Sequence, residues 1–106
     1  MNIKELEQLV IKFRDDRNWK QYHTPKNLTQ ALASEVGELN DLYLWNREPE
    51  KSSVGQEMAD ILIYLLSLAD IAEIDLTQEI IFKLQINEVK YPIKKARGND
   101  KKYSEL

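Results

Sequence analysis

The chain has 106 residues, no cysteine, one histidine and a formal net charge of −3 at pH 7. These values exclude disulfides, thiolate metal sites and zinc sites built on several histidines, and they argue against binding of bare nucleic acid, which needs a basic surface. The length suits one domain (1–106), no apolar run approaches the roughly 20 residues of a membrane span, and no apolar signal core is present, so the expected location is cytoplasmic.

The first two helices are predicted from apolar spacing and from start signals. Apolar residues recur at helical intervals over about 3–18. Thr24 before Pro25 indicates the start of the next helix, because a hydroxyl caps free amides and proline needs no amide partner at that position. The second helix is therefore expected over about 25–46.

The third and fourth helices follow two further caps. Ser52 or Ser53 is the expected cap of the third helix, which continues to about Ala72. Asp75, with a glutamine three residues later, resembles a capping box. The fourth helix is expected over about 76–90, because the proline that follows disfavours helical geometry in the residue before it.

The predicted fold class is all-α, a four-helix bundle with a mobile tail at about 99–106. The segment 58–72 is apolar nearly all round, and such a helix needs cover on every side. Three companion helices leave one flank uncovered, so we expect a homo-oligomer that forms through this apolar face. The alternative is a tightly wrapped monomer.

Acidic residues form two pairs at helical spacing: Glu35 with Glu38 in the second predicted helix, and Glu57 with Asp60 in the third. Residues three apart share a face of a helix, where like charges repel each other. Helices joined by a short loop pack antiparallel, and both pairs lie about two turns from that loop. Four carboxylates are therefore expected to converge, although any one such pair alone is most often a solvated face.

A buried carboxylate cluster is unstable without a cation, because burial and mutual repulsion raise its pKa values and protonate it. Mg²⁺ resolves this conflict, since it accepts a few carboxylates and keeps waters for substrate phosphates, and Mn²⁺ is an alternative. The only histidine, His23, is in no Glu-x-x-His motif of the di-iron type, and no Gly-rich phosphate loop is present. The pattern predicts non-redox metal chemistry on an oxygen-rich anion.

Three motifs resemble those of a known family. EVGEL and QEMADILIYLL resemble the ExxE…ExxD signature of the all-α nucleoside triphosphate pyrophosphohydrolases, the MazG-like superfamily. FRDDRNWKQYHTPKNL is similar to the W-x-x-F/Y-H-x-P-R/K-N-L segment of the dCTP pyrophosphatase branch, and a later K-x-x-x-N-x-x-K-Y-P element also matches. The resemblance covers about 6–98. Val10 departs from it, because the animal dCTP enzymes carry a histidine there.

The resemblance implies Mg²⁺-dependent cleavage of a nucleoside triphosphate between its α and β phosphates, in a homodimer or homotetramer with active sites near the subunit interface. Four residues are implied as metal ligands: Glu35, Glu38, Glu57 and Asp60. Four are implied around the base and sugar: Trp19, His23, Trp45 and Tyr64. Four are implied at the phosphates: Lys83, Asn87, Lys90 and Tyr91.

Most of these residues have a structural alternative. Trp19 and Trp45 suit core or interface anchors as well as base stacking, and Tyr64 suits packing. His23 suits a brace for the turn before the second helix. Lys83 suits a solvated face.

The predicted mechanism is in-line attack of water on the α-phosphorus. Glu38 is the residue expected to orient that water, while the cation and Lys83 stabilise the departing pyrophosphate. The resemblance implies that the substrate is dCTP or a modified or non-canonical deoxynucleoside triphosphate that is removed from the nucleotide pool. The alternative function is a non-catalytic helical module whose acidic faces bind a partner.

Overall fold

The structure is a computed structural model that describes residues 1–106. It contains α-helices, 3₁₀ turns and no strand, so the all-α class is confirmed. The chain divides into two compact units, 1–74 and 75–106. The single domain, the four-helix bundle and the oligomer stay predictions. No helix is both long and apolar enough to cross a membrane.

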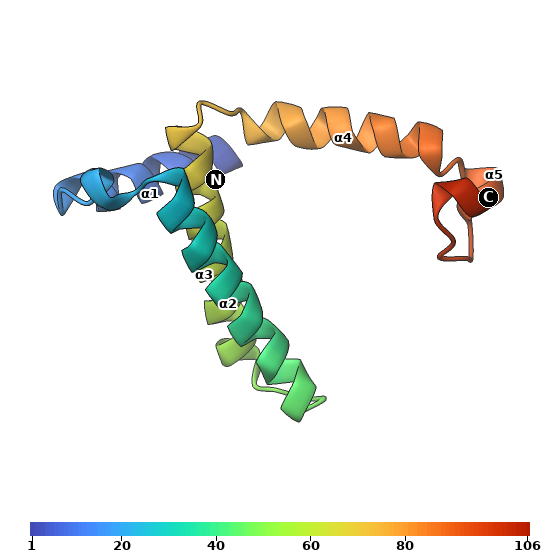
Figure 1. Ribbon diagram of the computed structural model, residues 1–106, viewed down its shortest axis with the longest axis horizontal. Helices are drawn as coiled ribbons and strands as arrows, with labels where there is room; N and C mark the ends of the chain where they lie inside the picture. The colour runs from blue at the N-terminus through green and yellow to red at the C-terminus, as the bar shows by residue number, and fades with distance from the viewer. The chain divides into compact units, whose positions relative to one another are not determined.

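The first unit is built on an antiparallel pair of long helices. These are α2 (Pro25–Trp45) and α3 (Lys51–Ile71), which pack along each other and are joined by the short segment 46–50 (Figure 1). The helix α1 (Ile3–Asp16) packs against α3. A short 3₁₀ turn, η1 (Lys20–Tyr22), connects α1 to α2.

The segment between α1 and α2 is determined by local chemistry. The helix α1 ends two residues before the predicted bound, because Asn18 has a left-handed backbone (φ 54°), which asparagine tolerates better than most residues. Thr24 caps α2 as predicted, with its hydroxyl accepting the N–H of Asn27 at 3.1 Å. The side-chain amide of Asn27 donates to the backbone carbonyl of Tyr22 at 2.9 Å, which connects the 3₁₀ turn to α2.

The predicted start of α3 is wrong by two or three residues. The helix begins at Lys51, so Ser52 and Ser53 lie inside it, and its N-cap is Glu50 with no side-chain cap. The earlier start adds a backbone hydrogen bond from the N–H of Val54 to the carbonyl of Glu50, at 3.1 Å. That bond replaces the serine cap expected from the sequence.

The second unit contains α4 (Leu76–Lys90), the short α5 (Ile93–Ala96) and η2 (Tyr103–Glu105). Asp75 caps α4 as predicted, with its carboxylate accepting the N–H of Gln78. The end of the chain is not extended throughout, because η2 places Tyr103 edge-on to Tyr91, with ring centroids 6.3 Å apart.

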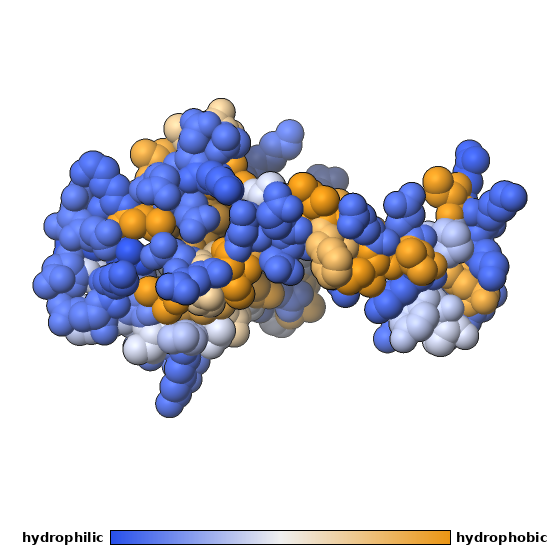
Figure 2. All heavy atoms as spheres, turned by 90° about the horizontal axis from the view of Figure 1, so that it is seen from above, coloured by the Kyte–Doolittle hydropathy of each residue, from blue (hydrophilic) through white to orange (hydrophobic).

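The fully buried core is small. Its apolar members are Leu28, Leu66 and Ala69, joined by the buried Arg14 and Ser67. Many large apolar side chains stay exposed, and Figure 2 shows hydrophobic residues along α4. The large hydrophobic residues of α4 that stay exposed are Ile80, Ile81, Phe82, Leu84 and Val89. Soluble monomers rarely leave so much contiguous apolar surface uncovered.

Candidate functional site

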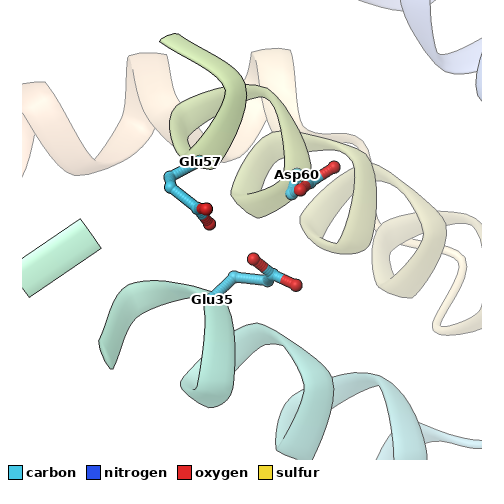
Figure 3. A group of neighbouring side chains, drawn as sticks. All are labelled: Glu35, Glu57 and Asp60. Atoms are coloured by element: carbon cyan, nitrogen blue, oxygen red, sulfur yellow. The ribbon is translucent and has the colours of Figure 1, made fainter. Parts of the chain in front are cut away.

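Three acidic side chains converge between α2 and α3. Glu35 comes from α2, and Glu57 and Asp60 come from successive turns of α3 (Figure 3). One carboxylate oxygen from each lies within 4.8 Å of the other two. The spacing of three residues along α3, opposite an antiparallel α2, brings together three of the four carboxylates that were expected to converge.

The carboxylate group lacks compensating hydrogen-bond donors. One oxygen of Glu35 and one of Glu57 are buried with no hydrogen-bond partner. The pKa of Glu35 is raised to about 7. The largest cause is a hydrogen bond with Glu57 that requires Glu35 to be protonated, and the further causes are burial and the interactions with Glu38 and Asp60. A proton on Glu35, or a cation in its place, relieves the repulsion within the group.

A divalent metal ion fits this site. All donors are carboxylate oxygens, which suit hard cations, and two of those oxygens have no partner within the protein. No thiol or imidazole belongs to the group, so a soft or nitrogen-preferring ion is a poorer match. Buried orphan oxygens are rare in folded proteins and call for such an explanation.

A pocket of about 480 Å³ adjoins the carboxylate group, between α1, the segment before α2, and α3. Its walls are mostly apolar, with Asp60, Arg14, His23 and Ser67 as polar members. The apolar and aromatic lining residues are Leu9, Val10, Phe13, Trp19, Ile63 and Tyr64. Asp60 belongs to both the pocket and the carboxylate group. An apolar hollow with a few convergent polar groups is typical of a small-molecule site.

Trp19 lines the pocket and is held in place by the end of α1. Its backbone N–H donates to the carbonyl of Arg14 at 3.1 Å. Its indole meets the ring of Phe13 edge-on, with centroids 5.8 Å apart. Because the indole remains 44% exposed, it retains a face for a ligand. The structure thus brings Trp19, His23 and Tyr64 to one pocket, as their predicted role requires.

Comparison with known proteins agrees with this geometry. Residues 21–106 match the MazG-like family. The dCTP pyrophosphatase 1 proteins of Mus musculus and Homo sapiens are each 37% identical over 114 aligned residues, which cover 98% of this chain and 67% of theirs. A crystal structure of a pyrophosphatase from Archaeoglobus fulgidus superimposes with a TM-score of 0.79 at 42% identity, covering 85% of this chain and 92% of that one.

The chain belongs to the MazG-like family. The family expected from the motifs is confirmed, and with it the class of enzyme, a nucleoside triphosphate pyrophosphohydrolase. The alternative of a non-catalytic module finds no support, because the relatives just described are named as pyrophosphatases.

Two residues predicted for this MazG-like site lie outside the features described so far. Glu38 is exposed and does not belong to the carboxylate group, although its charge contributes to the raised pKa of Glu35. Trp45 ends α2, is 83% exposed and does not line the pocket. Their roles as metal ligand and base contact stay predictions.

The four residues predicted at the phosphates belong to the second unit. Lys83 is exposed on α4, and Asn87 is half-buried one turn later. The ammonium of Lys90 lies 4.8 Å from the centre of the Tyr103 ring, which Tyr91 also contacts. Within this unit Lys90 and Tyr91 form one aromatic and cationic cluster, and the phosphate contacts themselves stay predictions.

The sequence reasoning missed Arg14. It lies in the charged run FRDDR and resembles a solvated residue, yet it is 3% exposed and lines the pocket. Its charge and the burial of the imidazole both lower the pKa of His23, with burial as the larger cause. His23 is therefore neutral near pH 7, and its Nδ1 atom is buried without a hydrogen-bond partner. The i, i+4 spacing places Arg14 on the same helical face as Val10, but it does not show that this face packs on α3.

Proposed function

We propose that this protein hydrolyses dCTP, or a modified form of it, to the nucleoside monophosphate and pyrophosphate. The observation that carries the proposal is the position of Asp60, which lines the aromatic pocket and belongs to the carboxylate group. A nucleotide with its base and sugar in the pocket has its phosphates near these carboxylates. Cytosine is proposed because the relatives named above are dCTP pyrophosphatases.

Mg²⁺ is the proposed ion, with Glu35, Glu57 and Asp60 as the residues that would hold it. The ion supplies charge neutralisation for phosphate oxygens that these carboxylates otherwise repel. Mg²⁺ suits a site of few carboxylates because it keeps several waters and binds substrate phosphates readily. Mn²⁺ is expected to replace it, since both ions prefer oxygen ligands.

The protein side chains then have separate tasks. Trp19 and Tyr64 hold the base and sugar, and stacking on an aromatic face contributes about 1–3 kcal/mol per base. Glu38, which is exposed beside Glu35, orients the attacking water and takes its proton. The water oxygen bonds to the α-phosphorus while the bond from that phosphorus to the bridging oxygen breaks, and pyrophosphate leaves. Lys83, Asn87, Lys90 and Tyr91 remain the proposed phosphate contacts.

We also propose that the active form is a homodimer or homotetramer. The support is the number of large apolar side chains that stay exposed, such as Met58 on α3 and Phe82 on α4. Obligate interfaces between identical subunits are rich in such residues. Sedimentation of the wild-type chain tests this, and a monomer at micromolar concentration contradicts it.

Release of pyrophosphate from a panel of triphosphates, with Mg²⁺ and with excess chelator, tests the proposed function. We expect release from dCTP in Mg²⁺, one dCMP for each pyrophosphate, and no release in chelator. Production of dCDP and orthophosphate indicates attack at another phosphorus and contradicts the proposal. Equal rates with and without the metal contradict the role of the carboxylate group.

A further inference from the structure

Arg14 is held in a fixed orientation inside the first unit. Its Nε donates to Asp15 at 2.9 Å, and its Nη1 donates to Asp70 on α3 at 2.7 Å. The side chain of Arg14 is only 3% exposed. A buried guanidinium is costly unless its charge and its donors are satisfied, and the two carboxylates meet most of that requirement.

One edge of this guanidinium is not used by the protein. A guanidinium carries five N–H donors and no acceptor. The Nη2 group of Arg14 donates none of the hydrogen bonds in the structure, and the cavity that Arg14 lines is the pocket beside Asp60. A donor anchored on one side and unused on the other, at the wall of a pocket, suits recognition of an acceptor on a ligand.

We propose that Arg14 reads the base: its Nη2 group donates a hydrogen bond to the N3 atom of cytosine. This inference rests on the proposed function, and it adds the residue that selects the base. The partner must be an acceptor, because a guanidinium only donates. Cytosine presents a bare ring nitrogen at N3, whereas uracil and thymine carry N3–H at the same position.

The selectivity follows from the hydrogen-bond pattern and not from size. In uracil and thymine the N3–H donor would face the Nη2 donor of Arg14. Both the N3–H group and this edge of the guanidinium would then be buried without hydrogen-bond partners. Sites built to hydrogen-bond a substrate reject the mismatched analogue strongly for this reason. Val10, one turn before Arg14 on the same face, contributes only apolar wall.

The first experiment uses the wild-type enzyme and an analogue of dCTP in which N3 is replaced by C–H. The analogue keeps the exocyclic amino group, the carbonyl and the triphosphate. We expect kcat/KM to be about 10- to 100-fold lower than for dCTP, the range for a hydrogen bond to a charged group. Equal kcat/KM values for the two substrates overturn the proposal.

The second experiment removes the guanidinium. Because Arg14→Met alone leaves Asp70 unpaired, the test uses Arg14→Met with Asp70→Asn. We expect the ratio of kcat/KM between dCTP and the analogue to fall to within about threefold of one, and the preference for dCTP over dUTP to shrink similarly. Lys12→Met is the matched control, since it removes a cation from an exposed face of α1 and should keep both ratios.

The outcomes separate the possible explanations. If Arg14 is only a structural link between α1 and α3, the double variant loses activity toward all substrates equally and keeps both ratios, which overturns the proposal. If the double variant does not fold, the wild-type comparison decides alone. Absence of pyrophosphate release from every triphosphate is a failure of the proposed function, and it is visible before either ratio is measured.

Discussion

Asp60 lies where two regions of different chemistry meet. On one side is the carboxylate group, made by facing turns of α2 and α3, with orphan oxygens and a raised pKa at Glu35. On the other side is the pocket, where α1 contributes aromatic and aliphatic walls and one anchored arginine. A cation suits the carboxylate group and a neutral ring suits the apolar pocket, so the proposed substrate, a nucleotide with its bound cation, fits both. Changes on the two sides should therefore have different kinetic signatures.

The largest effect is expected on the acidic side, from Asp60→Asn. The substitution keeps the shape but removes a charge, and kcat should fall about 100- to 1,000-fold, as for loss of one electrostatic contact to a transition state. Because it also removes repulsion, the metal-free protein should be no less stable. Pyrophosphate release and thermal unfolding measure the two quantities.

Asp41→Asn is the control for this substitution, because Asp41 is exposed on α2 and does not belong to the carboxylate group. Its kcat should stay within about twofold of wild type, as is usual for surface changes. An Asp60→Asn variant with full activity removes Asp60 from the catalytic site.

A smaller effect is expected on the pocket side, from Trp19→Ala. Loss of one stacking face weakens substrate binding by about 1–3 kcal/mol, so KM should rise about 10-fold while kcat changes little. Trp45→Ala is the comparison, because Trp45 does not line the pocket. An equal rise in KM for both variants means that Trp45 also reaches the nucleotide, as the sequence predicts. No rise for Trp19→Ala contradicts its role in the pocket.

The two regions also differ in how far the sequence predicts them. Glu35, Glu57 and Asp60 come together through short-range rules: helical spacing, caps and a short connection that makes α2 and α3 antiparallel. Arg14 could not be assigned in this way. Its burial depends on where α1 lies on α3 and on Asp70, 56 positions later in the chain, and periodicity within one helix does not contain that information.

The same distinction holds for the helices. The caps Thr24 and Asp75 were predicted correctly because each acts on amides a few residues away. The start of α3 was predicted wrongly, because a helix can begin without a serine cap. Here Glu50 is the N-cap residue, and its side chain accepts no capping hydrogen bond. The contacts predicted for Lys83 and Asn87 stay predictions, because spacing along one helix does not specify what lies beside it.

The pH dependence of stability should distinguish the carboxylate group from the rest of the protein. The pKa of Glu35 is about 7, above the ordinary value of 4.5, so between these values the folded protein holds a proton that the unfolded chain releases. The free energy of unfolding contributed by this proton is present below pH 4.5 and is lost as the pH rises to about 7. In chelator, the unfolding midpoint should therefore fall over this range.

Excess Mg²⁺ should remove that fall, because a cation replaces the proton and binds better as the carboxylates ionise. Glu35→Gln provides the control, since it cannot titrate and should lose this part of the pH dependence. A midpoint that falls equally with Mg²⁺ and with chelator indicates that no cation occupies the group.

The smallest effect is expected at Thr24, which fixes the segment between α1 and α2 on the pocket side. Thr24→Ala removes the acceptor of the Asn27 N–H and should lower the free energy of unfolding by about 1 kcal/mol, measured by urea denaturation. Thr24→Ser keeps the acceptor and should lose little. Thr29→Ala, one turn later, removes a hydroxyl that only donates to helix carbonyls, so it should not be destabilising. Because His23 precedes this cap and lines the pocket, Thr24→Ala should raise KM slightly and leave kcat unchanged. A decrease in kcat with no change in KM would instead indicate that this turn supports the carboxylate group and not the pocket.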